Sequence, residues 1–184
     1  MTNQPSHAAY LGPDYPHWPT TLADASEVLI RAIGPQDAAA EKAFIESLSP
    51  RSRRNRFLGQ IAHPSDELVH RLTDIDYIND VALVAVTPEG AGYRIVGVSR
   101  YAVDATRKAC EFAVVVADAW QGKGQGTALV QCLKTLATGR GLQEMKSFDL
   151  AENWEMRDLA SALGFHSSPD PADRHQLIHT ISLA

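Results

Sequence analysis

The chain has 184 residues, of which 45% are hydrophobic and 21% are charged, and its formal net charge is −5. This length and composition predict one folded domain and exclude a disordered chain, while the acidic balance argues against a nucleic-acid partner. No apolar run is long enough to span a membrane, the first residues lack a secretory-signal pattern, and Cys110 and Cys132 are too few for a disulfide framework. We therefore expect a cytoplasmic protein with no membrane partner.

The first 25 residues are polar and contain four prolines, and we expect them to form an extended arm ahead of a domain over residues 26–184. Contacts of Tyr10, Tyr15 and Trp18 would drape this arm over the domain. A frayed tail is the alternative for residues 1–10.

Apolar periodicity in the remaining chain predicts six strands and four helices, joined by turns rich in Gly, Pro and Asp. The predicted strands are residues 27–33, 81–86, 93–101, 109–117, 145–150 and 177–183, and the predicted helices are residues 36–48, 65–72, 126–139 and 154–163. Short connections between the second, third and fourth strands predict an antiparallel meander. The order of elements predicts a single α+β domain with a mixed central sheet flanked by helices.

A glycine-rich turn is the most informative segment of the chain. Gly122, Gly124 and Gly126 alternate between a buried strand and a helix, and Lys123 adds a positive charge. Glycines let the backbone approach a ligand closely, and successive N–H groups at a helix N-terminus favour a phosphate. The spacing matches neither a Walker A loop nor a dinucleotide fingerprint. We expect a phosphate-binding loop, with an ordinary tight turn as the alternative.

The segment from Gln121 to Gly126 resembles the Q/R-x-x-G-x-G/A signature of the GCN5-related N-acetyltransferase (GNAT) family. Asn153 and the later Leu163-Gly164-Phe165 resemble that family's late helix and its closing LGF. Over roughly residues 15–166, the chain is similar to the acetyltransferase domain of bacterial protein-lysine acetyltransferases. The segments that carry this closer similarity include Tyr15-Pro16, Ile30-Arg31, Asp74-Ile75-Asp76-Tyr77 and Glu111-Phe112-Ala113-Val114-Val115-Val116.

The resemblance implies transfer of an acetyl group from acetyl-CoA, as co-substrate and without a metal, to a primary amine in a direct ternary complex. It also implies the residues that bind CoA: the backbone of Val114, Val115 and Val116 for the pantetheine arm, Asn153 for another part of that arm, and the N–H groups of Gln121, Gly122, Lys123, Gly124, Gln125, Gly126 and Thr127 for the pyrophosphate. The branch favours a protein lysine as acceptor. A small amine or amino acid, or a catalytically weak acyl-CoA sensor, are the alternatives, and a homodimer is possible.

Glu111 is the candidate general base, because acyl transfer to an ammonium group needs a proton acceptor. Strand alternation puts Glu111 on the face opposite Cys110 and Phe112, within an otherwise apolar run. Partial desolvation there would raise the pKa of the carboxyl group, and the resemblance places the base at this position. An exposed glutamate that faces solvent or pairs with Arg100 is the alternative.

Three further features bear on the mechanism and on substrate binding, and two of them allow more than one interpretation. Ala160 stands where many family members carry a tyrosine that protonates the leaving thiolate, so no side chain there supplies an acid. The arginines at positions 51, 53, 54 and 56 form either a solvated helix end or a docking site for a CoA phosphate or an acidic protein substrate. The acids at positions 74, 76 and 80 either cap a loop or line an acceptor cleft.

Overall fold

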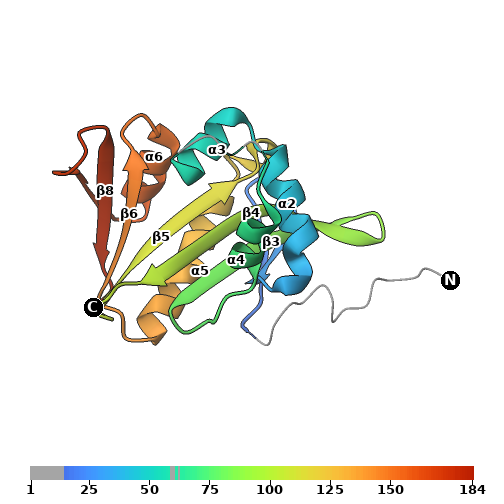
Figure 1. The fold of residues 1–184 in the computed structure, drawn as a ribbon, viewed down its shortest axis with the longest axis horizontal. Helices are drawn as coiled ribbons and strands as arrows, with labels where there is room; N and C mark the ends of the chain where they lie inside the picture. Colours follow the sequence, from blue (N-terminus) through green and yellow to red (C-terminus); the bar gives the residue numbers. More distant parts are fainter. Residues whose placement is uncertain (1–14, 59–60, 62) are drawn as a thin grey trace.

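The computed structural model describes residues 15–58, 61 and 63–184, and its centre is an eight-stranded mixed sheet (Figure 1). The strand order is β1-β2-β3-β4-β5-β6-β8-β7. Neighbouring strands are antiparallel except β5 and β6, which are parallel. The strands are β1 (Trp18–Thr21), β2 (Glu27–Ala32), β3 (Asp80–Glu89), β4 (Gly92–Val103), β5 (Ala109–Val116), β6 (Glu144–Leu150), β7 (His166–Pro169) and β8 (Gln176–Ser182).

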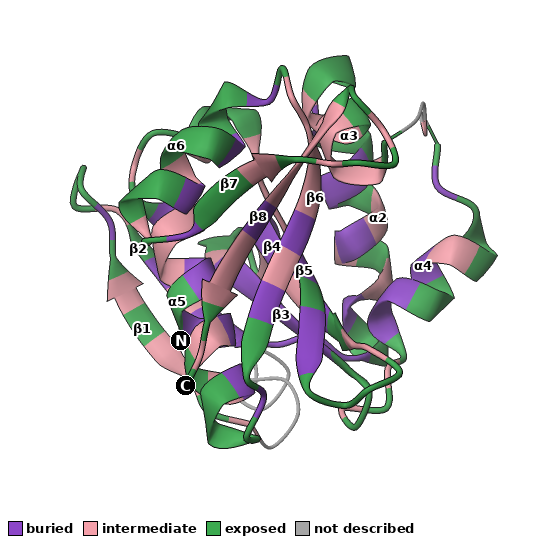
Figure 2. Ribbon diagram, turned by 90° about the vertical axis from the view of Figure 1, so that its left-hand side faces the viewer, coloured by how far each residue is buried: buried purple, intermediate pink, exposed green. Residues whose placement is uncertain are grey.

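Helices cover both faces of this sheet, as Figure 2 shows. The long helix α5 and helix α6 pack on one face, and α2 and α4 pack on the other. The helices are α2 (Ala38–Ser47), α3 (Pro50–Phe57), α4 (Asp66–Thr73), α5 (Gln125–Gly139) and α6 (Trp154–Ala162), with two short 3₁₀ helices, η1 (Pro35–Asp37) and η2 (Asp118–Trp120). The predicted α+β fold, with its meander of β3, β4 and β5, is confirmed.

Strand alternation assigns the buried side chains of β5 to two separate cores. Cys110 and Phe112 are buried in the core under α5 and α6, whereas Val115 packs against the core under α2 and α4. Glu111 points to the same face as Val115, next to Ala102 of β4 and Lys146 of β6. The predicted period of two in this strand is therefore correct.

Two elements, α3 and β7, differ from the sequence-based expectations. Residues 51–56 belong to a separate helix, α3, which Ser49 caps by accepting a hydrogen bond from the Ser52 N–H. This helix has no buried residue, so it has no apolar face from which to predict it. β7 overlaps the start of residues 167–174, which the sequence predicts to be a turn-rich loop; this strand is short and polar and ends at a proline.

The described part of the N-terminal segment, from residue 15 onward, contacts the rest of the domain. Trp18 begins β1, which pairs with β2, and its side chain packs against the α5 core. The Tyr15 ring lies 4.8 Å from the Tyr77 ring, and Arg140 donates hydrogen bonds to the Tyr15 hydroxyl and the Tyr77 carbonyl. The predicted contact through Tyr10 lies outside the described residues.

The parallel pair of β5 and β6 is much shorter than the strands themselves. The strands pair only at Ala109 with Glu144, Cys110 with Met145 and Glu111 with Lys146. Beyond these residues β5 and β6 diverge, while β4 continues to pair with β5 as far as Val116 (Figure 1). Among the described residues, no strand therefore pairs with the β6-facing edge of β5 from Phe112 onward.

No helix among the described residues is both long and apolar enough to cross a membrane.

Gly97 of β4 lets α5 pack closely on the sheet. A Cβ at this position would lie 2.3 Å from Nε2 of the buried Gln125 and 2.9 Å from a methyl carbon of Leu129. We expect Gly97→Ala to lower the free energy of unfolding by about 1–3 kcal/mol, measured by urea denaturation. The control is Gly139→Ala, where no atom lies within 4 Å and alanine favours the helix by up to about 1 kcal/mol. Equal stability of Gly97→Ala and the wild type would contradict this packing.

Candidate functional site

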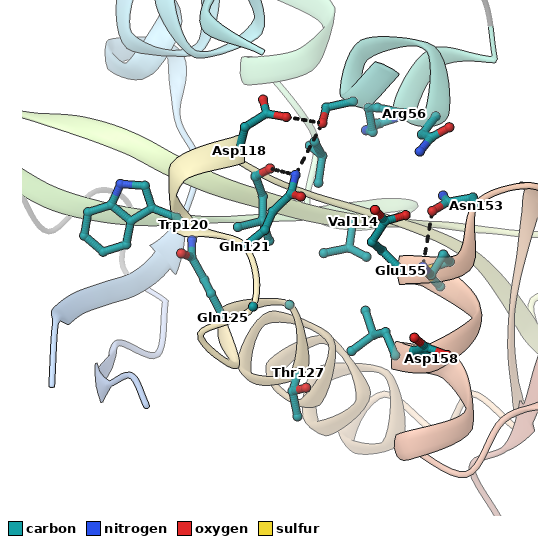
Figure 3. Close-up of a pocket in the computed structure, with 18 of the residues that line it drawn as sticks. Arg56, Val114, Asp118, Trp120, Gln121, Gln125, Thr127, Asn153, Glu155 and Asp158 are labelled. Carbon is teal, nitrogen blue, oxygen red and sulfur yellow. Dashed lines mark hydrogen bonds between the residues drawn. The ribbon is translucent and has the colours of Figure 1, made fainter. Parts of the chain in front are cut away.

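A pocket of about 410 Å³ lies where β5 and β6 diverge (Figure 3). Its walls come from α3, the end of β5, the glycine-rich turn, the start of α5 and one face of α6. The lining residues used below are Arg51, Ser52, Asn55, Arg56, Val114, Val115, Val116, Asp118, Trp120, Gln121, Gly122, Gly124, Gln125, Gly126, Thr127, Asn153, Glu155 and Asp158. The pocket thus brings together all but two of the predicted site residues.

Glycines shape the loop at the start of α5 through their backbone conformation. Gly122 and Gly124 have φ angles of +72° and +85°, in the left-handed region that disfavours other residues. A Cβ at either position would meet no atom within 4 Å, so conformation rather than space requires glycine here. Gly124 is the N-cap of α5 and has no side chain to bond the first N–H groups of the helix. Those donors, at the positive end of the helix dipole, suit an anion.

Asp118 ties this loop to α3. Its carboxylate accepts hydrogen bonds from the Ser49 N–H at 2.9 Å, the Ser49 hydroxyl at 2.7 Å and the Ser52 hydroxyl at 2.8 Å. Partial burial opposes ionisation of Asp118, but these hydrogen bonds outweigh it and lower the pKa of the carboxyl group. The Gln121 amide donates to the Val116 carbonyl at 3.0 Å and the Ser52 hydroxyl at 3.3 Å, as Figure 3 shows.

Two ion pairs join α3 to the opposite wall of the pocket. Arg51 contacts Glu155 at 2.6 Å, and Arg54 contacts Glu152 at 2.7 Å. All four side chains are more than half exposed, so each pair contributes at most about 1 kcal/mol. Because α3 buries no residue of its own, these polar contacts and the Asp118 hydrogen bonds hold it over the pocket.

The Lys123 side chain does not face the pocket, although the sequence analysis expected its charge to contribute to phosphate binding. Its ammonium group pairs with Asp24 at 2.8 Å and lies 4.9 Å from the centre of the Trp120 ring. Lys123 does not line the pocket, and its hydrogen bond to Asp24 lowers the pKa of that carboxyl group. The cation therefore anchors the loop to the turn after β1, and the loop's attraction for an anion rests on its main-chain donors.

Val114, Val115 and Val116 line the pocket along the unpaired edge of β5. Asn153 lines it from the other side and is buried. The Asn153 side chain caps α6 by accepting a hydrogen bond from the Met156 N–H at 3.2 Å. This contact fixes the start of α6 beside the pocket.

Glu111 lies at the last paired row of β5 and β6, outside the pocket lining. Its side chain is exposed, so the desolvation expected from its apolar neighbours in sequence is absent. Arg100, the alternative partner, instead donates a hydrogen bond to the Leu72 carbonyl at 2.9 Å. Glu111 is thus accessible to a substrate or to water at the point where the gap begins.

Asp149 of β6 is a second carboxyl group in this region, and the sequence analysis missed it. Burial and, to a smaller extent, the negative charge of Glu111 raise its pKa, which is about 6. A hydrogen bond from the Ser147 hydroxyl at 2.7 Å and the positive charge of Arg56 act in the opposite direction. The strand period of two could have found it, because Asp149 shares a face of β6 with Met145 and Ser147, which are buried.

Arg56 of α3 interacts electrostatically with Asp149. Burial and the nearby positive charge of Arg100 lower the pKa of Arg56 to about 10, although the charges of Glu41 and Asp149 act in the opposite direction. Glu41 is itself buried, and the loss of solvation raises its pKa to about 7 against the charges of Arg100 and Arg56. A small network of alternating charges therefore lies beside the pocket.

The other candidate groups have structural partners. Asp76 accepts hydrogen bonds from the N–H groups of Ile78, Asn79 and Asp80, which lower the pKa of its carboxyl group to about 2 and support the loop-capping interpretation. Position 160 of α6 holds a fully buried alanine, whose methyl side chain cannot donate a proton. Within the described parts of the chain, no three His, Cys, Asp or Glu side chains are arranged to hold a metal ion.

Residues 53–165 match the family model described as "Acetyltransferase (GNAT) family". A curated acetyltransferase of Pseudomonas aeruginosa is 41% identical over 183 residues, which are 100% of this chain and 98% of that protein.

The fold is also similar to solved structures. The GNAT domain of S. lividans PAT superposes with a TM-score of 0.83 at 24% identity, covering 92% of this chain and 99% of that chain. A GNAT acetyltransferase from Streptococcus pneumoniae superposes with a TM-score of 0.68 at 17% identity, covering 86% and 100%.

Replacement of Asp118 tests how α3 is held. In Asp118→Ala three hydrogen bonds to Ser49 and Ser52 are lost, each worth roughly 1 kcal/mol. We expect amide hydrogen exchange in α3 to accelerate at least about 10-fold. Asp66→Ala, which removes only an exposed pair with Lys42, is the control and leaves α3 unchanged. Unaltered exchange in α3 of Asp118→Ala would show that Asp118 is dispensable.

The titration of Asp149 tests its electrostatic link to Glu111. Carboxyl ¹³C NMR of the wild type is expected to show Asp149 titrating near pH 6. Glu111→Gln removes a like charge and lowers this pKa, whereas Ser147→Ala removes a hydrogen bond to the carboxylate and raises it. Opposite shifts in the two variants are the expected result, and no shift in Glu111→Gln would place the two carboxyl groups too far apart to interact.

Proposed function

This chain belongs to the GNAT family of acetyltransferases, which use acetyl-CoA as co-substrate, and from that premise we propose that it transfers an acetyl group from acetyl-CoA to the side chain of a protein lysine. The observation that carries the proposal is the unpaired edge of β5 beside the uncapped start of α5. No other part of the described pocket lining combines a free strand edge with a helix N-terminus.

The two ends of acetyl-CoA fit these two features. The pyrophosphate is an anion and suits the main-chain donors of the turn: Gln121, Gly122, Lys123, Gly124, Gln125, Gly126 and Thr127. The pantetheine arm carries two amide groups, so it can run along the exposed edge of β5 from Val114 to Val116 as an added strand would. The main-chain groups of Val114 and the Val116 N–H face this edge, whereas those of Val115 face β4. Asn153 is proposed to contact the same arm from the start of α6, through atoms that its capping bond leaves free.

Glu111 is proposed as the general base. A parallel strand rises about 3.3 Å per residue, so Val114 lies roughly 10 Å along β5 from Glu111. A lysine amine at the thioester is therefore expected to pass its proton to Glu111 through a chain of water molecules. The exposure of Glu111 leaves it free to release that proton to solvent after each turnover.

The reaction balances with these groups alone. Glu111 accepts one proton from the lysine ammonium group, and the neutral nitrogen attacks the thioester carbonyl carbon. A main-chain N–H of the β5 edge would hold the oxyanion that forms. The nitrogen then releases its second proton to water, the carbon–sulfur bond breaks, and an amide remains on lysine. The CoA thiolate takes a proton from water, because the alanine at position 160 has no acidic group.

The resemblance of the sequence to protein-lysine acetyltransferases supports the choice of acceptor. The high fold similarity to the GNAT domain of S. lividans PAT is consistent with that choice. A small-molecule amine is the competing acceptor. Steady-state CoA release with a panel of free amines, alongside mass spectrometry of lysine acetylation in a cell extract, separates the two.

Replacement of the proposed base tests the mechanism. We expect Glu111→Gln to lower kcat at least about 100-fold, because general-base catalysis typically contributes that much. Acetyl-CoA affinity in calorimetry should stay within about twofold, since Glu111 lies outside the pocket lining. Glu144→Gln, an exposed glutamate on the neighbouring strand, is the matched control and keeps normal turnover. Near-normal kcat in Glu111→Gln would reject this assignment.

A further inference from the structure

A second hollow adjoins the pocket on the outer side of α3. It has a volume of about 660 Å³ and shares Arg51 and Asn55 with the pocket. Its other walls include further α3 residues and the segment that leads into α6. We call the following set the α3 docking surface: Pro50, Arg51, Arg53, Arg54, Asn55, Glu152 and Trp154. A chain segment in this hollow would lie one helix width from the acyl-transfer site.

Trp154 gives this surface an apolar contact. It is the first residue of α6 and its side chain is 65% exposed, although it sits between the buried Asn153 and the pocket residue Glu155. The start of α6 is already capped by Asn153, so helix formation does not require a tryptophan here. Exposed tryptophans beside a hollow are the residues that most often dominate the energy of protein recognition.

Charge gives the surface a preference for an acidic partner. The chain as a whole has a net charge of −5, yet α3 has four arginines and no acidic residue in eight positions. The hollow presents three guanidinium groups, those of Arg51, Arg53 and Arg54, against the single carboxylate of Glu152. The side chains of Arg51 and Arg54 are 60% and 56% exposed, and their exposed ion pairs exchange readily with another carboxylate.

Arg53 remains the arginine best placed for a new carboxylate. Its Nη1 donates to the Glu46 main-chain carbonyl at 3.1 Å, and among the described residues no carboxylate forms an ion pair with its guanidinium group. A guanidinium fork binds a carboxylate through two parallel hydrogen bonds.

We propose that the α3 docking surface binds a segment of the acceptor protein that carries an acidic side chain and an apolar side chain close to the target lysine. The apolar side chain packs on Trp154, and the acidic side chain pairs with Arg53. The lysine then passes over α3 at Arg51 and Asn55, the two residues common to both hollows. This inference rests on the proposed function, because it requires a protein as the acceptor.

The test compares peptide acceptors with a free lysine side chain. The probes are a nonapeptide library with a central lysine and randomised flanks, and Nα-acetyl-lysine amide, which lacks flanks. We expect the wild type to favour library members with Asp or Glu and a large apolar residue near the lysine. Trp154→Ala should lower kcat/KM for those peptides about 5–10-fold, and Arg53→Glu should shift the preference to basic flanks. Turnover of Nα-acetyl-lysine amide and the KM for acetyl-CoA should stay unchanged in both variants.

Ile78→Ala is the matched control, because Ile78 is 67% exposed but lies in the loop before β3. Its peptide preference should equal that of the wild type. Acetylation of the library with the same preference in wild type, Trp154→Ala and Arg53→Glu would overturn the docking surface and leave the proposed function standing. Acetylation of small amines without any library member would overturn both.

Discussion

The early separation of β5 from β6 is the constraint on which the candidate site depends. Three residue pairs hold the two strands together, and from Phe112 onward β6 leaves the facing N–H and C=O groups of β5 without strand partners, although the Gln121 amide donates to the Val116 carbonyl. Such groups are costly unless water or a ligand bonds them. The sheet therefore carries, at its centre, a place where an extended molecule with amide groups can complete the hydrogen bonding. Every wall of the pocket is arranged around this opening.

The wall that covers the opening is held by polar contacts. α3 has no fully buried residue, and besides the contact of Phe57 with the core under α2 and α4 its attachment is polar, including the Asp118 hydrogen bonds and two exposed ion pairs. Contacts of this kind contribute little individually and weaken at high salt. The opposite wall, α6, is anchored by Met156 and Ala160 in the apolar core. The site therefore combines one firmly packed wall with one that local changes in charge can displace.

Sequence reasoning succeeded where the physical signal is local. The glycines at 122 and 124 were predicted to form the loop because only glycine readily adopts its positive φ angles. A helix was predicted over residues 65–72, and in the structure the Ser65 hydroxyl caps α4 by accepting a hydrogen bond from the Leu68 N–H. The inward and outward faces of β5 followed from alternation alone.

It failed where the signal depends on contacts far along the chain. Ser49 and Asp118 are separated by 69 residues, and neither carries a local mark of their pairing. The Lys123 charge was assigned to the ligand, since nothing near it in sequence shows that Asp24 binds it. α3 and β7 have no apolar period, because neither element buries a regular face. The burial of Asp149 also depends on segments distant in the sequence, since Asp149 pairs with Leu177 of β8 and lies near Arg56 of α3.

Amide chemical shifts on addition of acetyl-CoA test the central assertion most directly. The main-chain N–H resonances of Val114–Val116 and Gly122–Thr127 should move together and saturate at one affinity, because the ligand completes both the strand edge and the helix start. Saturable shifts confined to other segments, with these two stretches unmoved, would contradict the account.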